Sequence, residues 1–297
     1  MEKYKHIFGP MRLPFLILTP VCVLLGVSSA FWTSGHINLV DLFLLLAGGV
    51  MAHISVNTFN EYEDFKSGLD FRTTKSPFNG GSGTLIEQPE RAIFVQYLAW
   101  ISFSITAAIG FYFISSKGLS LLPLGIIGLG LIYSYTKWLI KHPVLCLLAP
   151  GTGFGIIMVL GTHFALTASY SLSSFVIALL PFFLVNNLLL LNQFPDIEAD
   201  KTVGRKHFPI AYGEKTSMVI FGLFLILAYL IVILGVCLKL LPALSLLGIL
   251  TSIFMIPTFI KLFKYHDQPK QLSRYLGMNV LNTLLMPILV SIGLIVH

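Results

Sequence analysis

Long apolar segments, separated by short polar connections, recur along the whole chain. Each is about twenty residues long, which is the length that a helix needs to cross a hydrocarbon core of about 30 Å. None shows the alternating polarity over about ten residues that is typical of strands in a membrane β-barrel. The pattern therefore predicts an all-α polytopic membrane protein with nine spans, at residues 13–33, 38–60, 92–115, 119–138, 143–165, 171–194, 216–238, 240–262 and 275–296.

The composition agrees with a membrane protein and indicates one domain. Hydrophobic residues make up 56% of the 297 residues and charged residues 11%, whereas a soluble domain has about 25% charged residues. The first apolar segment lacks a cleavage site of small residues, so we expect a retained helix rather than a signal peptide. The longest polar connections, 61–91 and 195–215, are too short for a second domain. We expect a single integral membrane domain over residues 1–297.

Basic residues are distributed unevenly over the two sides of the predicted membrane. If the N-terminus lies in the cytoplasm, all of the 19 lysines and arginines except Lys117 and Lys239 fall on the cytoplasmic side. This is the positive-inside distribution, and it explains the net charge of +6 without a nucleic acid partner. We expect a protein embedded in the lipid bilayer of a bacterial or archaeal cytoplasmic membrane.

A polar cluster follows the second predicted span, where residues 60–70 read NEYEDFKSGLD. Helical spacing places four polar side chains on one stripe of this span: His53, Asn57, Asn60 and Asp64. Polar side chains are costly against lipid, so the stripe should face a cavity inside the bundle. Gly68 is a typical helix end, and a bend there would return Asp70 to the same region. The alternative is an ordinary solvated helix end.

A second cluster follows the sixth predicted span, where residues 192–200 read NQFPDIEAD. Asp196 and Asp200 are one helical turn apart, and Asn192 precedes them at the end of the span, where it can line the same cavity. Both clusters follow spans that run towards the cytoplasm, so they meet at one membrane face. This correspondence predicts two four-helix pseudo-repeats plus a ninth helix around a central cavity, with the active site on the cytoplasmic side.

The two clusters together have the chemistry of a site for a metal ion and a diphosphate. Carboxylate and amide oxygens suit Mg²⁺, which proteins often hold with a few carboxylates while it bridges phosphate groups. Basic side chains that can neutralise phosphate oxygens follow both clusters: Arg72, Lys75, Lys201, Arg205 and Lys206. Each alone is an ordinary marker of the cytoplasmic side, but their position beside the carboxylates favours phosphate binding.

The paired motifs and the nine spans resemble the UbiA superfamily of intramembrane prenyltransferases over essentially the whole chain. Within it, the two motif sequences are most similar to the 1,4-dihydroxy-2-naphthoate prenyltransferase branch. The resemblance implies Mg²⁺-dependent transfer of a prenyl group from a prenyl diphosphate to an aromatic acceptor, namely 1,4-dihydroxy-2-naphthoate or a related quinone precursor.

The resemblance also implies roles for individual residues. It implies a set of metal ligands, of which the last assists: Asn60, Asp64, Asp196, Asp200 and Asp70. It implies that Lys137 contacts the diphosphate, and it pairs Lys137 with Tyr133, one helical turn earlier in the sequence YSYTK. Asp64, Asp196, Lys137 and Tyr133 would act in catalysis.

A mechanism follows from these residue types. Mg²⁺ and nearby cations would stabilise the charge that develops on the departing diphosphate. The allylic carbocation must be kept from water, which the interior of a helix bundle does. Tyr133 and Tyr135, near the cytoplasmic end of the fourth span, can offer π faces to the cation. With Asn57 and Asn192, Tyr135 would line the cavity, and the isoprenoid tail would lie in an apolar tunnel.

Some departures from the family pattern leave the acceptor open. Glu61 stands where the family usually has aspartate, and Ala211 stands where a basic residue is frequent. A terpene cyclase that ionises the same diphosphate without an acceptor is one alternative. An ion-coupled transporter is another, although it predicts acids near the bilayer midplane rather than at one face. A glycine loop with Gly80, Gly81 and Gly83 is either a lid over the diphosphate or a simple flexible turn.

Overall fold

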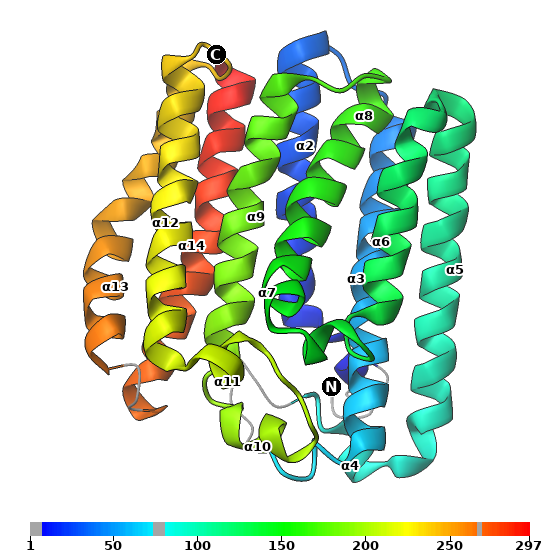
Figure 1. Cartoon of the computed structure of the whole chain (residues 1–297). Coiled ribbons are helices and arrows are strands. Elements are labelled where there is room, and N and C mark those ends of the chain that lie inside the picture. Colours follow the sequence, from blue (N-terminus) through cyan, green and yellow to red (C-terminus); the bar gives the residue numbers. More distant parts are fainter. Residues whose placement is uncertain (1–7, 74–80, 266–268) are drawn as a thin grey trace.

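The structure is a computed structural model that describes residues 8–73, 81–265 and 269–297. Within these ranges every regular element is a helix, which confirms the all-α prediction (Figure 1). The long helices stand side by side in a bundle: α2 (Leu18–Ser34), α3 (Leu39–Ser67), α5 (Ala92–Lys117), α9 (Leu172–Asn192), α12 (Glu214–Cys237), α13 (Ser252–Tyr265) and α14 (Pro269–Val296).

The number of spans differs from the prediction in one place. In the described part of the chain, eight helices are long and apolar enough to cross a membrane. The span predicted at 119–138 is a shorter apolar helix, Leu119–Ser134, and most of it is α6 (Leu122–Ser134). The chain leaves the helix in a turn at 135–138 and continues as a short 3₁₀ helix. The fold class is therefore confirmed, whereas the number of nine full-length spans is not.

The predicted fifth span is one continuous helix made of three parts: α7 (Pro143–Gly151), a π-helical segment (Thr152–Leu160) and α8 (Gly161–Thr167). Two glycines bring it very close to α9. A Cβ atom on Gly155 would lie 2.4 Å from the backbone nitrogen of Phe182, and the Gly151 N–H donates to Asn186 Oδ1 at 2.6 Å. Because α9 has the largest buried share of all the spans, this contact fixes one wall of the interior against the centre of the bundle.

The two ends of α3 are defined by side-chain and backbone geometry. At its start, Asn38 Oδ1 accepts hydrogen bonds from the N–H groups of Val40 and Asp41, as an N-cap residue does. At its end, Gly68 adopts the left-handed conformation with a φ of 77°, which confirms the predicted helix end. The chain then turns back, and Asp70 is buried against the bundle.

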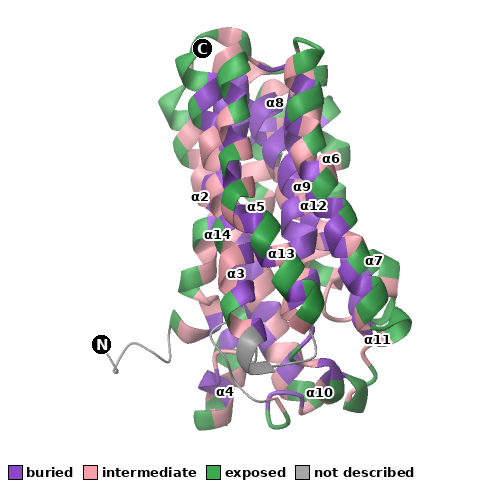
Figure 2. Cartoon of the chain, turned by 90° about the vertical axis from the view of Figure 1, so that its left-hand side faces the viewer, coloured by how far each residue is buried: buried purple, intermediate pink, exposed green. Residues whose placement is uncertain are grey.

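Three short helices cover the end of the bundle at which α3 and α9 finish: α4 (Thr84–Glu87), α10 (Ile197–Thr202) and α11 (Phe208–Tyr212). They lie together in the lower part of Figure 1, and the C-terminus lies at the opposite end. In Figure 2 the buried residues run along the centre of the bundle and the exposed residues cover its outside. The two polar motifs therefore meet at one end of the molecule.

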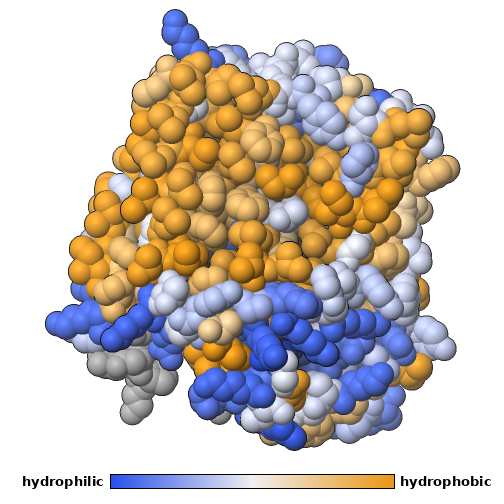
Figure 3. All heavy atoms as spheres, viewed as in Figure 1, coloured by the Kyte–Doolittle hydropathy of each residue, from blue (hydrophilic) through white to orange (hydrophobic). Residues whose placement is uncertain are grey.

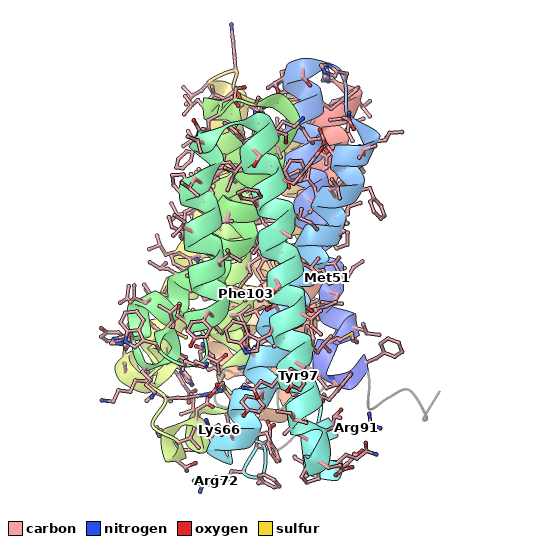
Figure 4. All side chains as sticks on the ribbon, turned by 90° about the vertical axis from the view of Figure 1, so that its right-hand side faces the viewer. Met51, Lys66, Arg72, Arg91, Tyr97 and Phe103 are labelled. Atoms are coloured by element: carbon pink, nitrogen blue, oxygen red, sulfur yellow. The ribbon has the colours of Figure 1, made fainter. Side chains whose placement is uncertain are left out.

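The surface has the distribution of polarity that a bilayer requires. Figure 3 shows an apolar band over the long helices and a strongly hydrophilic region at the end that carries α4, α10 and α11. In Figure 4, Lys66, Arg72 and Arg91 lie at this polar end, with Tyr97 above them and Phe103 further along the same helix. Basic residues at the edge of an apolar band are typical of the membrane interface.

Candidate active site

A cavity of about 870 Å³ lies inside the bundle and reaches the polar end. Its walls come from α3, α5, α6, the α7–α8 span and α9, and they are mainly apolar. The predicted site residues that line it come from both motifs and from the region after α6: Asn57, Asn60, Asp64, Asp70, Tyr135, Asn192, Asp196 and Arg205. His53 also lines the cavity, deeper in the bundle, where it forms a hydrogen bond with Thr19. The two motifs, far apart in sequence, thus form one polar end of one apolar cavity.

Arg205 joins the two motifs directly. One of its nitrogens, Nη2, is paired with Asp64 Oδ1, and the other, Nη1, donates to Asp200 Oδ1 at 3.0 Å. The guanidinium is largely buried, with 13% of the side chain exposed. Burial alone would lower its pKa, but the charges of Asp64 and Asp200 hold the pKa of Arg205 above its ordinary value. Arg205 is therefore a permanent positive charge at the place where the acids meet.

Asp200 is held on both of its oxygens. Oδ1 accepts from Arg205, and Oδ2 lies 2.9 Å from His207 Nε2. Asp200 and His207 are both buried; His207 lines the cavity, whereas Asp200 lies just behind it. Sequence reasoning did not single out His207. The one hint in the sequence is that His207 follows Asp200 by seven residues. Helical phase does not predict the bend that brings His207 and Asp200 together.

Asp70, which also lines the cavity, lies close to two other acids, Glu61 and Asp64. Burial and the charges of Glu61 and Asp64 together raise the pKa of Asp70 to about 7, although Arg12 and Arg205 lower it. Its Oδ2 atom is buried and has no hydrogen-bond donor among the described residues. A carboxylate in this position needs a proton or a cation.

The Asp70→Asn variant should be more stable than the parent protein at pH 8, but not at pH 5, when no divalent cation is present. Between the unfolded pKa of about 3.9 and the folded pKa of about 7, the folded parent binds an additional proton, so its stability falls as the pH rises, by up to about 1.4 kcal/mol per pH unit. Asparagine does not titrate. Thermal unfolding in detergent with a chelator measures the difference, and a difference that is constant between pH 5 and pH 8 would contradict the expectation.

The available oxygen atoms fit a hard divalent cation. Besides Asp70 Oδ2, the side-chain oxygens Asn192 Oδ1 and Gln193 Oε1 are buried without a donor among the described residues, and all three residues line the cavity. Carboxylate and amide oxygens are the ligands that Mg²⁺ prefers. In the described ranges no three His, Cys, Asp or Glu side chains form a ready metal-binding group. Arg205 explains this, because its guanidinium lies between Asp64 and Asp200.

The predicted pair Tyr133 and Lys137 lies outside the cavity. The Lys137 ammonium stacks over the Tyr133 ring, 4.3 Å from its centroid, and it lies 3.5 Å from Glu63 Oε1. Tyr133 is 43% exposed and packs against Trp100 and Phe59 on the outer surface. Tyr135, two residues later, does line the cavity. The roles of Tyr133 and Lys137 in catalysis remain predictions, as does the role of the other site residues.

The remaining predicted phosphate-binding residues lie at the surface of the polar end. Arg72 donates to the backbone oxygen of Thr202 at 3.4 Å, Lys201 pairs with Glu198, and Lys206 is exposed. None of them lines the cavity. Lys75 lies outside the described residues, as does Gly80 of the glycine loop. Arg205 is thus the predicted basic residue that the structure brings to the acids.

A basic residue that the sequence analysis counted only in the positive-inside distribution also reaches the cavity. Arg12 lines it, and its Nη2 atom lies 3.2 Å from Oε2 of the fully buried Glu61. Arg12 precedes the first span, so its basic side chain was accounted for by the positive-inside distribution. The burial of Glu61 was the missing information, because an acid at a helix end usually faces water.

Comparison with known proteins identifies the family. The model of the UbiA prenyltransferase family matches residues 19–283. The chain belongs to the UbiA prenyltransferase family. It is similar to 1,4-dihydroxy-2-naphthoate octaprenyltransferase of Bacillus subtilis, with 32% identity over 199 residues, which cover 65% of this chain and 63% of that protein. The match therefore spans somewhat less than two thirds of this UbiA-family relative.

Solved structures of the UbiA family share the fold. A UbiA homologue from Aeropyrum pernix K1 in its apo form has a TM-score of 0.70 at 18% identity, over 95% of this chain and 98% of that chain. A UbiA homologue from Archaeoglobus fulgidus, solved with GPP and Mg²⁺, has a TM-score of 0.66 at 14% identity, over 99% and 100% of the two chains. These likenesses confirm that the helical bundle of the present chain is the UbiA fold.

Proposed function

We propose that this protein transfers a prenyl group from a prenyl diphosphate to an aromatic acceptor, in a Mg²⁺-dependent reaction at the polar end of the cavity. The observation that carries the proposal is that acids from two distant motifs line one end of a single cavity whose walls are mainly apolar. The polar end suits a diphosphate with its metal ion, and the apolar part suits an isoprenoid tail. The Archaeoglobus homologue was solved with GPP and Mg²⁺, which supports a prenyl diphosphate and Mg²⁺ as the ligands.

The metal would be held by oxygen ligands from both motifs: Asn60, Asp64, Asp70 and Asp196. When bound, Mg²⁺ would supply positive charge to the departing diphosphate. Arg205 adds a largely buried positive charge between the motifs, and Arg12 adds a partly buried one that lines the cavity beside Glu61. Asp200 contacts Arg205 and His207 and therefore positions these two side chains. The role of Asp200 as a metal ligand stays a prediction.

The chain's own residues keep the reacting carbon away from water. The cavity beyond the acids is lined by aliphatic and aromatic side chains of α3, α5, α6 and the α7–α8 span. A carbocation formed at the polar end would therefore have a low-water environment in which the aromatic acceptor can attack it. Tyr135 lines the cavity, where its ring can stabilise positive charge.

We propose 1,4-dihydroxy-2-naphthoate as the acceptor and a polyprenyl diphosphate as the donor. The support is the similarity to the Bacillus subtilis octaprenyltransferase, which is named for this naphthoate. We further propose that the polar end faces the cytoplasm, because it carries the basic residues Lys66, Arg72 and Arg91 (Figure 4). The bacterial or archaeal cytoplasmic membrane remains our prediction for its location.

A product assay tests the function. Purified protein in liposomes should convert prenyl diphosphates and 1,4-dihydroxy-2-naphthoate into prenylated naphthoate and diphosphate when Mg²⁺ is present, and it should stop when Mg²⁺ is chelated. Other hydroxylated aromatic acids serve as competing acceptors, and mass spectrometry identifies the products. Release of diphosphate with a cyclic hydrocarbon and no acceptor requirement would show a cyclase instead. No release under any condition would overturn the proposal.

A further inference from the structure

Glu61 is the most enclosed acid near the site, and it binds groups from two other segments. Its side chain is completely buried. The backbone N–H of Ser82 lies 3.0 and 3.1 Å from its two oxygens, and the Ser82 hydroxyl also donates to Oε1. Arg12 Nη2 donates to Oε2 at 3.2 Å. One carboxylate of α3 thus holds the N-terminal segment and the loop that precedes α4.

The loop that Glu61 holds packs directly on Asp70. Gly81 adopts a φ of 59°, and a Cβ atom there would lie 2.8 Å from Asp70 Oδ1. Gly81 and Ser82 both line the cavity. The Ser82 hydroxyl also lies within hydrogen-bond distance of Thr84, which fixes the start of α4. The backbone of this loop therefore forms the wall behind Asp70.

The N-terminal segment completes the arrangement from the other side. A Cβ atom on Gly9 would lie 2.4 Å from Thr84 Oγ1, so the segment contacts the loop closely. Asn57 Nδ2 donates to the backbone oxygen of Met11 at 3.0 Å, which attaches the segment to α3. Arg12 itself has the left-handed φ of 53°, so the direction of its side chain depends on these contacts. Its guanidinium is then fixed by Glu61.

We propose that Glu61 is a positioning residue that fixes the loop at Gly81 and Ser82 and the side chain of Arg12 around the polar end of the cavity. Glu61 does not line the cavity, so it acts through these two groups rather than on the substrate. Only the kinetic consequence of this inference rests on the proposed function. The structural consequence, a loop held in place by one carboxylate, stands on the contacts of Glu61.

Glu61→Gln is the sharpest variant, because it keeps the shape of the side chain. A carboxylate offers two accepting oxygens, whereas an amide offers one oxygen and an NH₂ group that donates. Since Ser82 and Arg12 both donate to Glu61, one of them must then face another donor. The exposed Glu90, on the same connection, provides the matched control Glu90→Gln.

Hydrogen–deuterium exchange of the purified protein, without substrate, tests the structural part. The amide of Ser82 should exchange at least tenfold faster in Glu61→Gln than in the parent protein, and Glu90→Gln should leave it unchanged. Equal exchange in all three proteins would overturn the proposal. This measurement needs no activity, so it stands even if the protein turns over none of the prenyl diphosphates.

Steady-state kinetics test the functional part. Glu61→Gln should raise the KM for geranylgeranyl diphosphate about tenfold and change kcat less. The variant displaces the loop at Ser82 and the Arg12 side chain, whereas the residues proposed to act in catalysis stay in place. Ser82→Ala, which keeps the backbone hydrogen bond, should raise KM by a smaller factor, and the double variant should show less than the product of the two factors. A fall in kcat with an unchanged KM would show a merely structural role for Glu61. So would a double variant whose KM rises by the product of the two single factors. Ser82→Ala keeps the test decisive if Glu61→Gln does not fold.

Discussion

Asp64→Asn should reduce prenyl transfer by about 100- to 1,000-fold at saturating substrate, the range expected when one group that stabilises developing charge is lost. Asp64 lines the cavity and is paired with Arg205, so the variant removes both a proposed metal ligand and the partner of the buried cation. Asparagine has nearly the same size, so the helix and its packing should remain. Product formation in liposomes, at several Mg²⁺ concentrations, measures the effect.

The matched control for Asp64→Asn is Glu198→Gln, which removes an acid from the second motif without touching the cavity. The Glu198 side chain is 85% exposed and pairs with Lys201 at the surface, so activity should change less than twofold, as is usual for a surface substitution. Normal turnover by Asp64→Asn would overturn the assignment of Asp64 to the metal site. A similar loss in both variants would point to a general effect of charge.

Arg205→Met should have the largest combined effect on stability and activity. It leaves Asp64 and Asp200 buried near each other without their shared cation, and breaking a buried pair in this way costs about 3–5 kcal/mol. Prenyl transfer should fall with it, because the same guanidinium is proposed to contact the diphosphate. Arg205→Lys should restore little of either property, because an ammonium cannot bind two carboxylates with the geometry of a guanidinium.

A double variant separates the stability effect of Arg205 from any other role. If the destabilisation comes from unpaired acids, Asp64→Asn in the Arg205→Met background should recover part of the lost thermal stability, although it cannot recover activity. Arg205 and Asp64 are in direct contact, so the changes in the free energy of unfolding caused by the two substitutions should not add. Additive destabilisation would mean that Arg205 stabilises the fold through contacts other than its two acids.

Several features of the fold and site were predictable because they depend on periodicity alone. Apolar length located the spans, and the helical phase of α3 placed Asn57, Asn60 and Asp64 on one stripe, where all three line the cavity. The direction of the spans brought the second motif to the same end. The glycine at position 68 ended the helix as expected and returned Asp70 to the site.

The sequence did not predict the positions of side chains that depend on tertiary contacts. Helix α6 ends at Ser134, earlier than its apolar length suggests, and the turn that follows leaves Lys137 with Glu63 outside the cavity. Glu61 looked like one of several acids at a helix end. Its burial depends on Arg12 and Ser82, which lie 49 and 21 residues away in sequence. No local pattern carries that information.

The pairing of Arg205 with both motifs has a consequence for how the protein is made. Acids that await a metal ion would repel one another in a newly inserted chain, and a bundle that needed Mg²⁺ to neutralise them could close only where the ion is available. Here the neutralising cation is part of the polypeptide and lies between Asp64 and Asp200. Membrane insertion and helix assembly can therefore bring Asp64 and Asp200 together without the help of a bound ion.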